Sequence, residues 1–405
     1  MLVFSKPAIY ALELTSQCNN RCPGCSNVYR DHRFATLMPA ATWVALIDTF
    51  ADAAVHLRLT GGEPTLHPEF FEILKAATSH RAWVTVFTNG RWGEPASFVT
   101  RLRDWPRLAG LLISVHGARP SSHEAVNGVT GSFDETVTNV RLAVEHGVTV
   151  ALSTVITHRN WDELDAVVEL ADSLGASHVA FNRYLGPVLP GIEPGREELR
   201  AAVETIETLR ETGAPAKYGV GIPQCFTPNS SQGCLAGVAY VSVDPWGSIR
   251  PCAHSPTVVG SLQEASIEEI WHGDVMNAWR ALMPSDCTTC AAYNVCHGGC
   301  RAVQELRSNG RDPLRGEPLE SYKPSDEIYE IPVNVRPVAR VRLRREDFGY
   351  TVLGDHGFLP VAPEAKHVID ACDGHQTFGE LAVRFGEAEL NLLGEMWQLG
   401  MLDPG

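Results

Sequence analysis

Apolar runs of strand length alternate with amphipathic stretches of helix length from Tyr10 to about Thr212. We predict strands for the apolar runs, at Leu12–Thr15, His56–Thr60, Trp83–Thr88, Leu111–Val115, Val148–Ile156 and His178–Tyr184. We predict helices for the amphipathic stretches, at Ala40–Asp52, Pro68–Thr78, Pro95–Asp104, Phe133–His146, Asn160–Leu174 and Pro194–Thr212. Pro39 precedes the first predicted helix, and Asn160 is the predicted cap of the fifth. Such repeats of strand and helix predict a parallel sheet, either open and doubly wound or a partial barrel, with the chemistry at the carboxyl ends of its strands.

The alternation stops between about Val220 and Asp326, where the chain is rich in Gly, Pro and Cys. Two short helices are predicted there, at Ile267–Trp271 and Val275–Leu282. So little apolar sequence needs a staple, and bound metal can supply it. The stretch from Pro313 to Pro324 mixes Pro, Gly and charged residues and is predicted to be a linker.

Regular patterning returns from Ile331 to Gly405. Three strands are predicted, at Ala339–Leu343, Tyr350–Leu353 and Phe358–Val361, and three helices, at Pro363–Cys372, Thr377–Phe385 and Glu387–Leu399. This order of elements predicts a small winged-helix-like module.

Length and charge narrow the class of protein. The chain has 405 residues, of which 44% are apolar, and we expect two or three domains from this length. The formal net charge of -15 disfavours a nucleic-acid partner, because phosphate binding needs a clustered basic surface. No apolar run reaches the length of a membrane span, and Met1 to Tyr10 lacks the pattern of a secretory signal. We therefore predict a cytoplasmic protein with no membrane partner.

The eleven cysteines are the unusual feature of this composition. All but one fall in two groups, at positions 18–25 and 225–300, whereas core cysteines would be scattered. In a reducing cytosol such groups indicate metal ligation or redox chemistry rather than disulfides. Cys372 stands alone in an apolar stretch and is predicted to be a core residue.

The first group follows the first predicted strand directly and contains Cys18, Cys22 and Cys25. Three thiolates can hold three irons of a cubane [4Fe–4S] cluster and leave the fourth iron open to another ligand. The alternative is a zinc loop, which needs a fourth ligand nearby, and His32 is the candidate for it.

This Cys-x3-Cys-x2-Cys loop resembles the signature of the radical S-adenosylmethionine (SAM) superfamily. The resemblance implies that the open iron binds the amino and carboxylate groups of SAM, which is cleaved to a 5′-deoxyadenosyl radical. It also implies cofactor contacts at the ends of the next three strands, at Gly61, Gly62, Glu63, Pro64, Asn89 and Ser114. The glycines let the backbone approach the ligand, and Glu63 can accept from an ammonium. Gly24 departs from the family, which often has an aromatic residue there, so stacking on adenine is expected from Tyr29 or Phe34.

The second group resembles the SPASM domain, an extension of radical SAM enzymes that carries two auxiliary iron–sulfur clusters. The resemblance implies an inner cluster, nearer the active site, and an outer one. The inner cysteines are Cys234, Cys252 and Cys300, and the outer cysteines are Cys287, Cys290 and Cys296.

The seventh cysteine of the SPASM pattern is missing from this chain. It should follow Asp312-Pro313, where Leu314 stands instead. For the outer cluster the alternatives are Asp312 or another oxygen ligand, an open iron, or a different cluster type. For the inner cluster they are Cys225 or a site open to a substrate group. Structural zinc on Cys287–Cys300 is the competing interpretation of this group.

The C-terminal module resembles the PqqD-like peptide recognition element of ribosomal peptide maturation. The matching segments are Arg336-Pro337, Phe358-Leu359, Cys372–Gly374, Thr377-Phe378 and Leu399–Leu402. Such elements bind a leader peptide as an extra strand on the exposed edge of a three-stranded sheet. The alternative is a generic winged helix that packs against the barrel and binds nothing.

Together the resemblances imply an α/β enzyme of three domains. These are a partial (β/α)6 barrel at residues 1–219, the SPASM domain at 220–326 and the peptide recognition domain at 331–405. The implied function is that of a maturase, an oxidoreductase that abstracts hydrogen from a ribosomally made precursor peptide and leaves a crosslink or thioether. The implied partners are the leader peptide and a flavodoxin or ferredoxin as electron donor.

Three other functions stay open at this point. They are a small-molecule radical SAM dehydrogenase, a sulfatase-maturase-like enzyme and a non-catalytic protein with structural zinc. Sulfatase maturases have an Asp base after the cysteine that matches Cys252, whereas Ala253 and His254 follow it here. His254 is therefore the candidate base.

Overall fold

The structure is a computed structural model, and it describes residues 2–29, 37–219, 221–227, 233–307, 311–322, 331–355 and 357–405. His32 and Phe34, candidates for a zinc ligand and for adenine stacking, lie outside the described residues.

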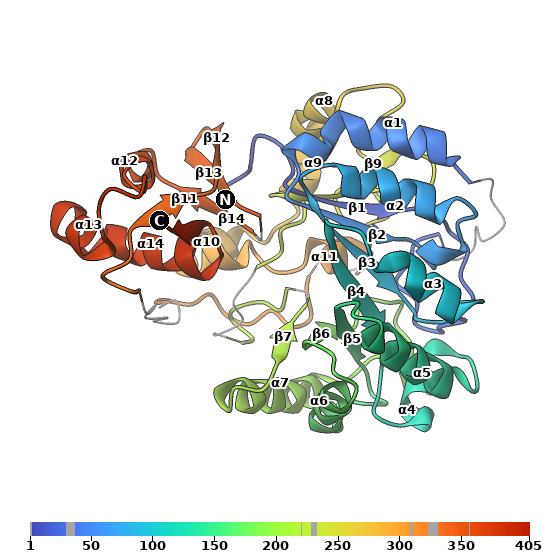
Figure 1. Cartoon of the computed structure of the whole chain (residues 1–405). Helices are drawn as coiled ribbons and strands as arrows, with labels where there is room; N and C mark the ends of the chain where they lie inside the picture. Colours follow the sequence, from blue (N-terminus) through green and yellow to red (C-terminus); the bar gives the residue numbers. More distant parts are fainter. Residues whose placement is uncertain are drawn as a thin grey trace.

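A ten-stranded sheet forms the centre of the molecule (Figure 1). Its strands are β1 (Ile9–Glu13), β2 (His56–Thr60), β3 (Trp83–Thr88), β4 (Leu108–Ser114), β5 (Val150–Ile156), β6 (Val179–Arg183), β7 (Ala216–Tyr218), β8 (Tyr240–Val243), β9 (Ser248–Arg250) and β10 (Gly260–Ser261). Their order is β10-β9-β8-β1-β2-β3-β4-β5-β6-β7, and the pairs from β8 through β1 to β7 are parallel. The predicted parallel sheet is confirmed. The Cys-rich segment extends it at the β1 edge.

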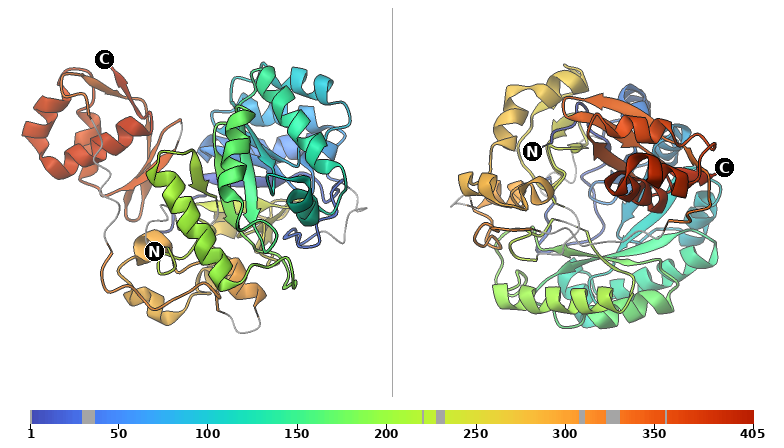
Figure 2. Two further views of the ribbon diagram at one scale, coloured as in Figure 1. Left: turned by 90° about the horizontal axis from the view of Figure 1, so that it is seen from below. Right: turned by 90° about the vertical axis from the view of Figure 1, so that its left-hand side faces the viewer.

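Helices cover the outside of this sheet (Figures 1 and 2). They are α1 (Ala40–Phe50), α2 (Phe70–Ser79), α3 (Pro95–Leu102), α4 (Pro120–Asn127), α5 (Ser132–Glu145), α6 (Leu164–Ser173) and α7 (Arg196–Glu211). The main core lies between helices and sheet; Trp43 and Ile47 of α1, for example, join Leu57 of β2 there. In β2 the burial alternates, so that Leu57 and Leu59 face the core while His56, Arg58 and Thr60 face the inner side. These three side chains of β2 line a cavity on the inner side of the sheet.

In the first domain, one predicted helix start is wrong, and the helix α4 was not predicted. Helix α6 begins at Leu164 with Glu163 as its N-cap, and Asn160 does not cap it. The side chain of Asn160 accepts from Thr157 N at 2.6 Å and donates to His116 O at 2.6 Å, so it fastens the turn after β5 to the end of β4. Helix α4 was not predicted, because its eight residues carry too few apolar positions to show a helical period.

The Cys-rich segment contains more helix than predicted. Besides α8 (Ile267–His272) and α9 (Asp274–Arg280) it forms the 3-10 helix η3 (Ser285–Thr289), α10 (Tyr293–Cys296) and α11 (Arg301–Leu306). The chain that follows passes back over the cysteines, and Leu314 is buried in the main core. Residues of the predicted linker at 313–324 therefore pack against the domain.

The C-terminal residues form a separate lobe (Figure 2). Its elements are β11 (Pro337–Ala339), β12 (Arg342–Glu346), β13 (Gly349–Leu353), β14 (Phe358–Val361), α12 (Ala365–Asp370), α13 (Phe378–Phe385), α14 (Glu387–Gln398) and β15 (Leu402–Pro404). The strands β12, β13 and β14 form an antiparallel sheet. The predicted strand Ala339–Leu343 is wrong as a single strand: the chain breaks after Ala339, and β11 pairs with β15 instead. Cys372 is buried in the core of this lobe, as predicted.

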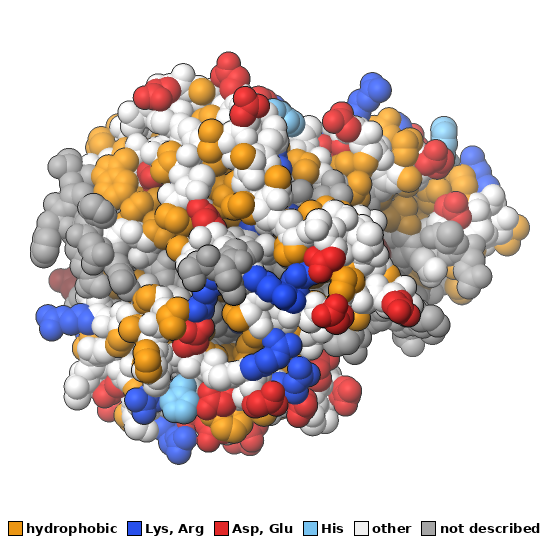
Figure 3. All heavy atoms as spheres, turned by 180° about the vertical axis from the view of Figure 1, so that it is seen from behind, with side chains coloured by type: hydrophobic (Ala, Val, Ile, Leu, Met, Phe, Trp, Pro, Cys, Tyr) orange, Lys and Arg blue, Asp and Glu red, His pale blue; other side chains and the backbone are white. Residues whose placement is uncertain are grey.

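The C-terminal lobe and the first domain meet through a small apolar cluster. Phe4, Val55, Ala239 and Leu353 are buried in it, and the rings of Phe4 and Phe358 meet edge-on at 5.2 Å. On the face that Figure 3 shows, acidic and basic side chains are interspersed. Among the described residues, no helix is both long and apolar enough to span a membrane.

Candidate cofactor and iron–sulfur site

The loop of Cys18, Cys22 and Cys25 follows β1 and is partly exposed. The backbone N–H of Asn20 donates to the Cys18 sulfur at 3.4 Å, and Cys25 N donates to Cys22 O at 3.3 Å. The loop thus turns back on itself and directs an N–H at one thiolate. N–H donors of this kind stabilise iron-bound thiolates. The three thiols fit a cluster held by three cysteines.

Two glycines bring the end of β2 against this loop. Gly61 has a φ of 140°, and a Cβ there would lie 2.5 Å from Thr15 O. A Cβ on Gly62 would lie 2.1 Å from Gln17 O. In this close approach Gly62 N donates to Thr15 O at 2.7 Å. A side chain at either position would push the cysteine loop away.

Glu63 is fully buried, and its carboxylate is already hydrogen-bonded. It accepts from Thr65 N at 3.3 Å and Thr65 Oγ1 at 2.7 Å, from Thr88 Oγ1 at 2.7 Å and from Asn89 N at 2.7 Å. Burial raises the pKa of Glu63, and these donors oppose the shift. The carboxylate that the sequence offers to an ammonium therefore ties β2 to β3. Pro64 begins the short turn that follows.

Asn89 and Arg91 hold the cysteine loop from the end of β3. Asn89 Nδ2 donates to Asn19 Oδ1 at 2.6 Å and lies 3.9 Å from the Cys18 sulfur. Arg91 Nη1 donates to Asn19 O at 2.9 Å and to Asn20 Oδ1 at 2.8 Å. Sequence reasoning missed Arg91, because a charge after a turn is ordinarily a solvated surface group. Ser114 ends β4 opposite Ser153 of β5.

Tyr184 fills the space beside Gly24. A Cβ on Gly24 would lie 2.5 Å from the hydroxyl of Tyr184, which comes from the end of β6. The ring of Tyr29 meets Trp246 edge-on at 5.0 Å, and Arg250 lies 4.3 Å from its centre. Tyr29 is thus packed against the Cys-rich segment. Tyr184 is the aromatic residue that contacts the cysteine loop at Gly24.

A cavity of about 610 Å³ occupies the inner side of the sheet. It reaches from Gly24 and Ser26 of the cysteine loop to Ala253 and His254 of the Cys-rich segment. Arg58 lines it, between the rings of Phe87 at 5.6 Å and Tyr240 at 5.5 Å. A volume of this size accommodates a cofactor and part of a substrate.

His254 lies in the wall of this cavity, two residues after Cys252. Its backbone N–H donates to the Cys252 sulfur at 3.5 Å, and its Nδ1 is buried without a partner among the described residues. Burial lowers the pKa of His254 to about 4. The ring is therefore neutral at pH 7.

The three cysteines predicted for the inner set, Cys234, Cys252 and Cys300, lie near one another. Cys252 directly precedes Ala253, which lines the cavity. Burial raises the pKa of the Cys252 thiol, and the neighbouring Cys234 and Cys300 raise it further. Thiols in such a place ionise only when a cation compensates the charge, and cluster irons supply one.

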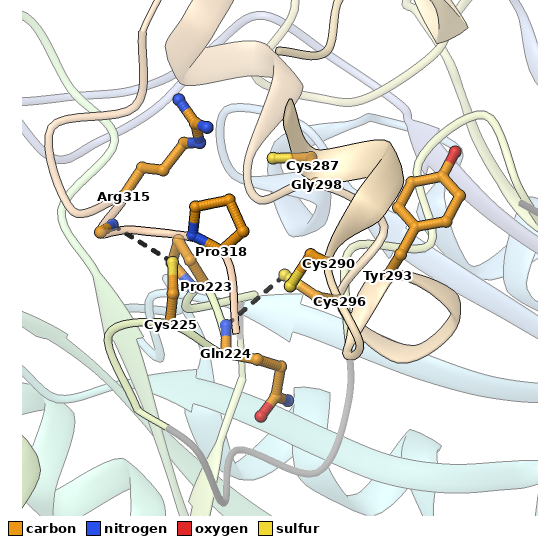
Figure 4. A pocket seen from close by; sticks show the side chains of 11 residues that line it. Pro223, Gln224, Cys225, Cys287, Cys290, Tyr293, Cys296, Gly298, Arg315 and Pro318 are labelled. Atoms are coloured by element: carbon orange, nitrogen blue, oxygen red, sulfur yellow. Dashed lines mark hydrogen bonds between the residues drawn. The ribbon is translucent and has the colours of Figure 1, made fainter. Parts of the chain in front are cut away.

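Cys287, Cys290 and Cys296 line a second, smaller pocket, and Cys225 lines it with them (Figure 4). The sequence offered Cys225 to the inner set, whereas the structure groups it with the outer one. Among the described residues, no three Cys, His, Asp or Glu side chains converge as the ligands of a single metal ion do. The thiolates of a cubane need no such convergence, because each binds its own iron.

Asp312, offered as an outer ligand, is buried in an ion pair instead. Its carboxylate accepts from Arg183 Nη1 at 2.7 Å and Nη2 at 2.9 Å. It also accepts from Cys300 N at 3.3 Å and Leu314 N at 3.0 Å. With both oxygens engaged, Asp312 joins the end of β6 to the Cys-rich segment.

Two family models match the chain. The radical SAM superfamily matches residues 12–171, and the SPASM family, an iron–sulfur cluster-binding domain, matches residues 234–300. The chain is therefore an enzyme with a radical SAM domain at residues 12–171 and a SPASM domain at residues 234–300. The radical SAM domain implies a [4Fe–4S] cluster that binds SAM, and the SPASM domain implies auxiliary iron–sulfur clusters. These assignments replace the zinc alternatives.

Individual proteins that are similar to this chain share only a minority of its residues. A PqqA peptide cyclase of Granulibacter bethesdensis is 25% identical over 83% of this chain and 93% of its own length. An AdoMet-dependent heme synthase of Methanosarcina barkeri is 27% identical over 78% of this chain and 97% of its own length. The crystal structure of Streptococcus suis SuiB bound to its precursor peptide SuiA has a TM-score of 0.66 at 17% identity, covering 77% of this chain and 76% of SuiB.

Proposed function

We propose that this enzyme modifies a ribosomally made precursor peptide, leaving a crosslink or a thioether. The observation that carries the proposal is the cavity that runs from Gly24 and Ser26 of the cysteine loop to Ala253 and His254, which follow Cys252. A substrate bound there would lie between the first cluster and the inner one. The likeness to PqqA peptide cyclases supports a peptide as the substrate. The heme synthase relative keeps a small-molecule substrate as the second candidate.

Cys18, Cys22 and Cys25 would hold the cluster that binds SAM, and SAM would supply the 5′-deoxyadenosyl radical needed for hydrogen abstraction. The chain's own residues position that cofactor. Gly61 and Gly62 bring the end of β2 to the cysteine loop, and Asn89 and Arg91 hold the loop in place. The inner cysteines stand where an auxiliary cluster could take up the substrate's electron, which makes the modification a net oxidation.

His254 is the proposed base for the proton that leaves with that electron. It lines the cavity beside Ser26 of the cysteine loop, and its unpartnered Nδ1 is free to accept a hydrogen bond. Replacement by alanine should leave SAM cleavage intact and reduce the yield of modified peptide per 5′-deoxyadenosine formed. An unchanged ratio would assign His254 a structural role beside Cys252.

The C-terminal lobe is the proposed binding site for the leader peptide. Its three-stranded sheet has β12 and β14 at its edges. Pro360 lies in β14 and has no N–H to donate, whereas every residue of β12 keeps one. The leader therefore adds along β12, where main-chain hydrogen bonds can continue the sheet.

Hydrogen exchange of the full chain tests this site. Amides of Arg342–Glu346 should exchange more slowly when a leader peptide from a precursor encoded beside this gene is added. A scrambled leader of the same composition is the control. Two results would contradict the assignment. One is slower exchange in β14 alone, and the other is unchanged exchange with the leader of every precursor encoded beside this gene.

The activity itself is tested anaerobically with SAM, a reductant such as a flavodoxin or ferredoxin system, and candidate precursors. The expected result is 5′-deoxyadenosine together with a precursor that has lost hydrogen by mass. The Cys22→Ala variant, which lacks one cluster ligand, should give neither product. Turnover of a small molecule without change to any neighbouring precursor would favour the second candidate.

A further inference from the structure

The outer cysteines lack a fourth ligand at the place where the sequence pattern puts one. Leu314 occupies that place, and its side chain is 5% exposed in the main core. Asp312 is engaged by Arg183 and by two backbone N–H groups. Leu314 has no atom that can bind iron, and Asp312 could bind it only by losing these hydrogen bonds. The ligand must come from elsewhere, or the cluster keeps an open iron.

We propose that Cys225 is the fourth ligand of the outer auxiliary cluster. It lies between β7 and β8, and its thiol lines one pocket with Cys287, Cys290 and Cys296. Figure 4 shows Cys225 across the pocket from Cys290 and Cys296. Cys290 caps the C-terminus of η3, and Cys296 is the last residue of α10. A cysteine far upstream in the sequence thus takes the role of the missing downstream one.

N–H donors surround these sulfurs as they surround cluster ligands. Gly316 N donates to Cys225 at 3.2 Å, Leu319 N to Cys290 at 3.3 Å, and Gln224 N to Cys296 at 3.4 Å. The side chain of Arg315 hydrogen-bonds to Cys287. Each of the four sulfurs therefore has a donor that stabilises a thiolate. The sulfur of Cys225 thus accepts a hydrogen bond, as do the sulfurs of the three cysteines that the SPASM pattern assigns to the outer cluster.

The segment that lacks the usual cysteine still closes the site. Gly316 and Leu319 lie just after Leu314 and supply the N–H groups on Cys225 and Cys290. A Cβ on Gly316 would lie 3.3 Å from Cys225 O, so this glycine lets the two segments touch. Here the segment donates hydrogen bonds to a cluster that another loop ligates.

This assignment leaves the inner set with three cysteines. Of the eleven cysteines, three belong to the SAM cluster, four to the outer set and three to the inner set, and Cys372 is buried in the C-terminal lobe. No cysteine remains for the inner cluster. Its fourth position is therefore filled by a group other than a cysteine of this chain, which includes a substrate group.

The test uses full-length protein in which Cys18, Cys22 and Cys25 are all alanine, so that only the auxiliary clusters remain. Iron, sulfide and the electron paramagnetic resonance spectrum of the reduced protein are measured after anaerobic purification. In this background, the additional substitution Cys225→Ala should either remove about four irons per chain or change one spectral signal. That signal should be the one that Cys296→Ala also changes. Cys372→Ala is the matched control and should leave iron and spectrum unchanged.

Double variants decide between the two clusters. If Cys225 binds the outer cluster, Cys225→Ala with Cys287→Ala should look like Cys287→Ala alone, whereas Cys225→Ala with Cys252→Ala should lose both signals. The opposite pattern would place Cys225 in the inner set and overturn the proposal. So would a Cys225→Ala protein that matches Cys372→Ala.

Cys225→Ser separates ligation from folding. A serine oxygen can ligate iron, so this variant should keep the outer signal with a shifted reduction potential. If Cys225→Ala loses both auxiliary signals and Cys225→Ser matches the unsubstituted cysteine in both signal and potential, the residue is structural and the proposal is wrong. These readouts need no peptide, so they stand or fall apart from the proposed function.

Discussion

Two buried carboxylates of this enzyme hold separate segments together by hydrogen bonds and are not available as ligands. Glu63 and Asp312 each accept four hydrogen bonds, and in both cases the donors include residues far away in the sequence. A buried carboxylate persists only with such compensation. Glu63 joins β2 to β3 at the cysteine loop, and Asp312 joins the end of β6 to the Cys-rich segment at Cys300. Their removal should therefore disturb the clusters without removing a ligand.

Glu63→Gln tests this role. In the variant, one carboxylate oxygen is replaced by an amide N–H₂ group. This group faces either Asn89 N or the donors of Thr65 and Thr88, so two buried donors face each other and the hydrogen bond is lost. We expect a loss of about 1–3 kcal/mol in unfolding free energy and weaker SAM binding, measured by denaturation and by titration of anaerobic protein. Glu135→Gln, which breaks only the partly exposed pair with Arg91, is the control. Equal losses in both variants would contradict the argument.

Three histidines make the fold sensitive to acid; His116 and His123 are buried, and His56 is partly buried in the cavity wall. Burial lowers the pKa of His56 and His123 to about 3 and that of His116 to about 4. The unfolded chain binds these protons at about pH 6.5, so stability is full above that pH and falls as the pH drops towards the folded pKa values.

Each of these histidines should cost about 1.4 kcal/mol per pH unit below pH 6.5. His123→Gln, which keeps a polar partner for Asn127, should flatten the dependence by that amount between pH 6.5 and 5. Urea denaturation at several pH values measures the slope. The exposed His375 offers a control, because His375→Gln should leave the slope unchanged.

At the scale of elements, the sequence predicts what depends on local period. The strands at His56–Thr60 and Trp83–Thr88 are observed with the predicted bounds, because their burial alternates along the chain. The cap at Asn160 failed, since its side chain hydrogen-bonds to the neighbouring β4 end instead. The partner set of Cys225 and the contact of Tyr184 with Gly24 join residues far apart in sequence, so no local pattern could reveal them.

The close approach of β2 to the cysteine loop gives an element-scale prediction. In Gly62→Ala the new Cβ would stand 2.1 Å from the backbone oxygen of Gln17, which no rotamer can relieve. The loop must move, so we expect loss of SAM cleavage and of about four irons per chain. Gly93→Ala is the matched control, because a Cβ there meets no described atom within 4 Å. Normal iron content in Gly62→Ala would refute the packing argument.

At the scale of the whole molecule, the N-terminal segment connects the two ends of the proposed function. Phe4 N donates to Val238 O at 3.0 Å, just before β8, while the ring of Phe4 packs on Phe348 and Phe358 of the C-terminal lobe. Ser5 N donates to Glu346 of β12 at 2.5 Å. The segment that leads into β1 and the cysteine loop therefore also orients the lobe proposed to hold the leader.

Phe4→Ala should uncouple these two ends. It leaves a cavity where a 3% exposed ring was buried, at a cost of about 3–5 kcal/mol for such a truncation. The core of the C-terminal lobe is separate from this cluster, so leader affinity should be retained while peptide modification slows. SAM cleavage without peptide should be unchanged. Val383→Ala, at a 90% exposed position of α13, is the control. If leader affinity fell as far as the modification rate, the contact would support the lobe's own fold rather than its orientation. An unaffected rate would mean that the orientation of the lobe does not control delivery of the peptide to the cavity.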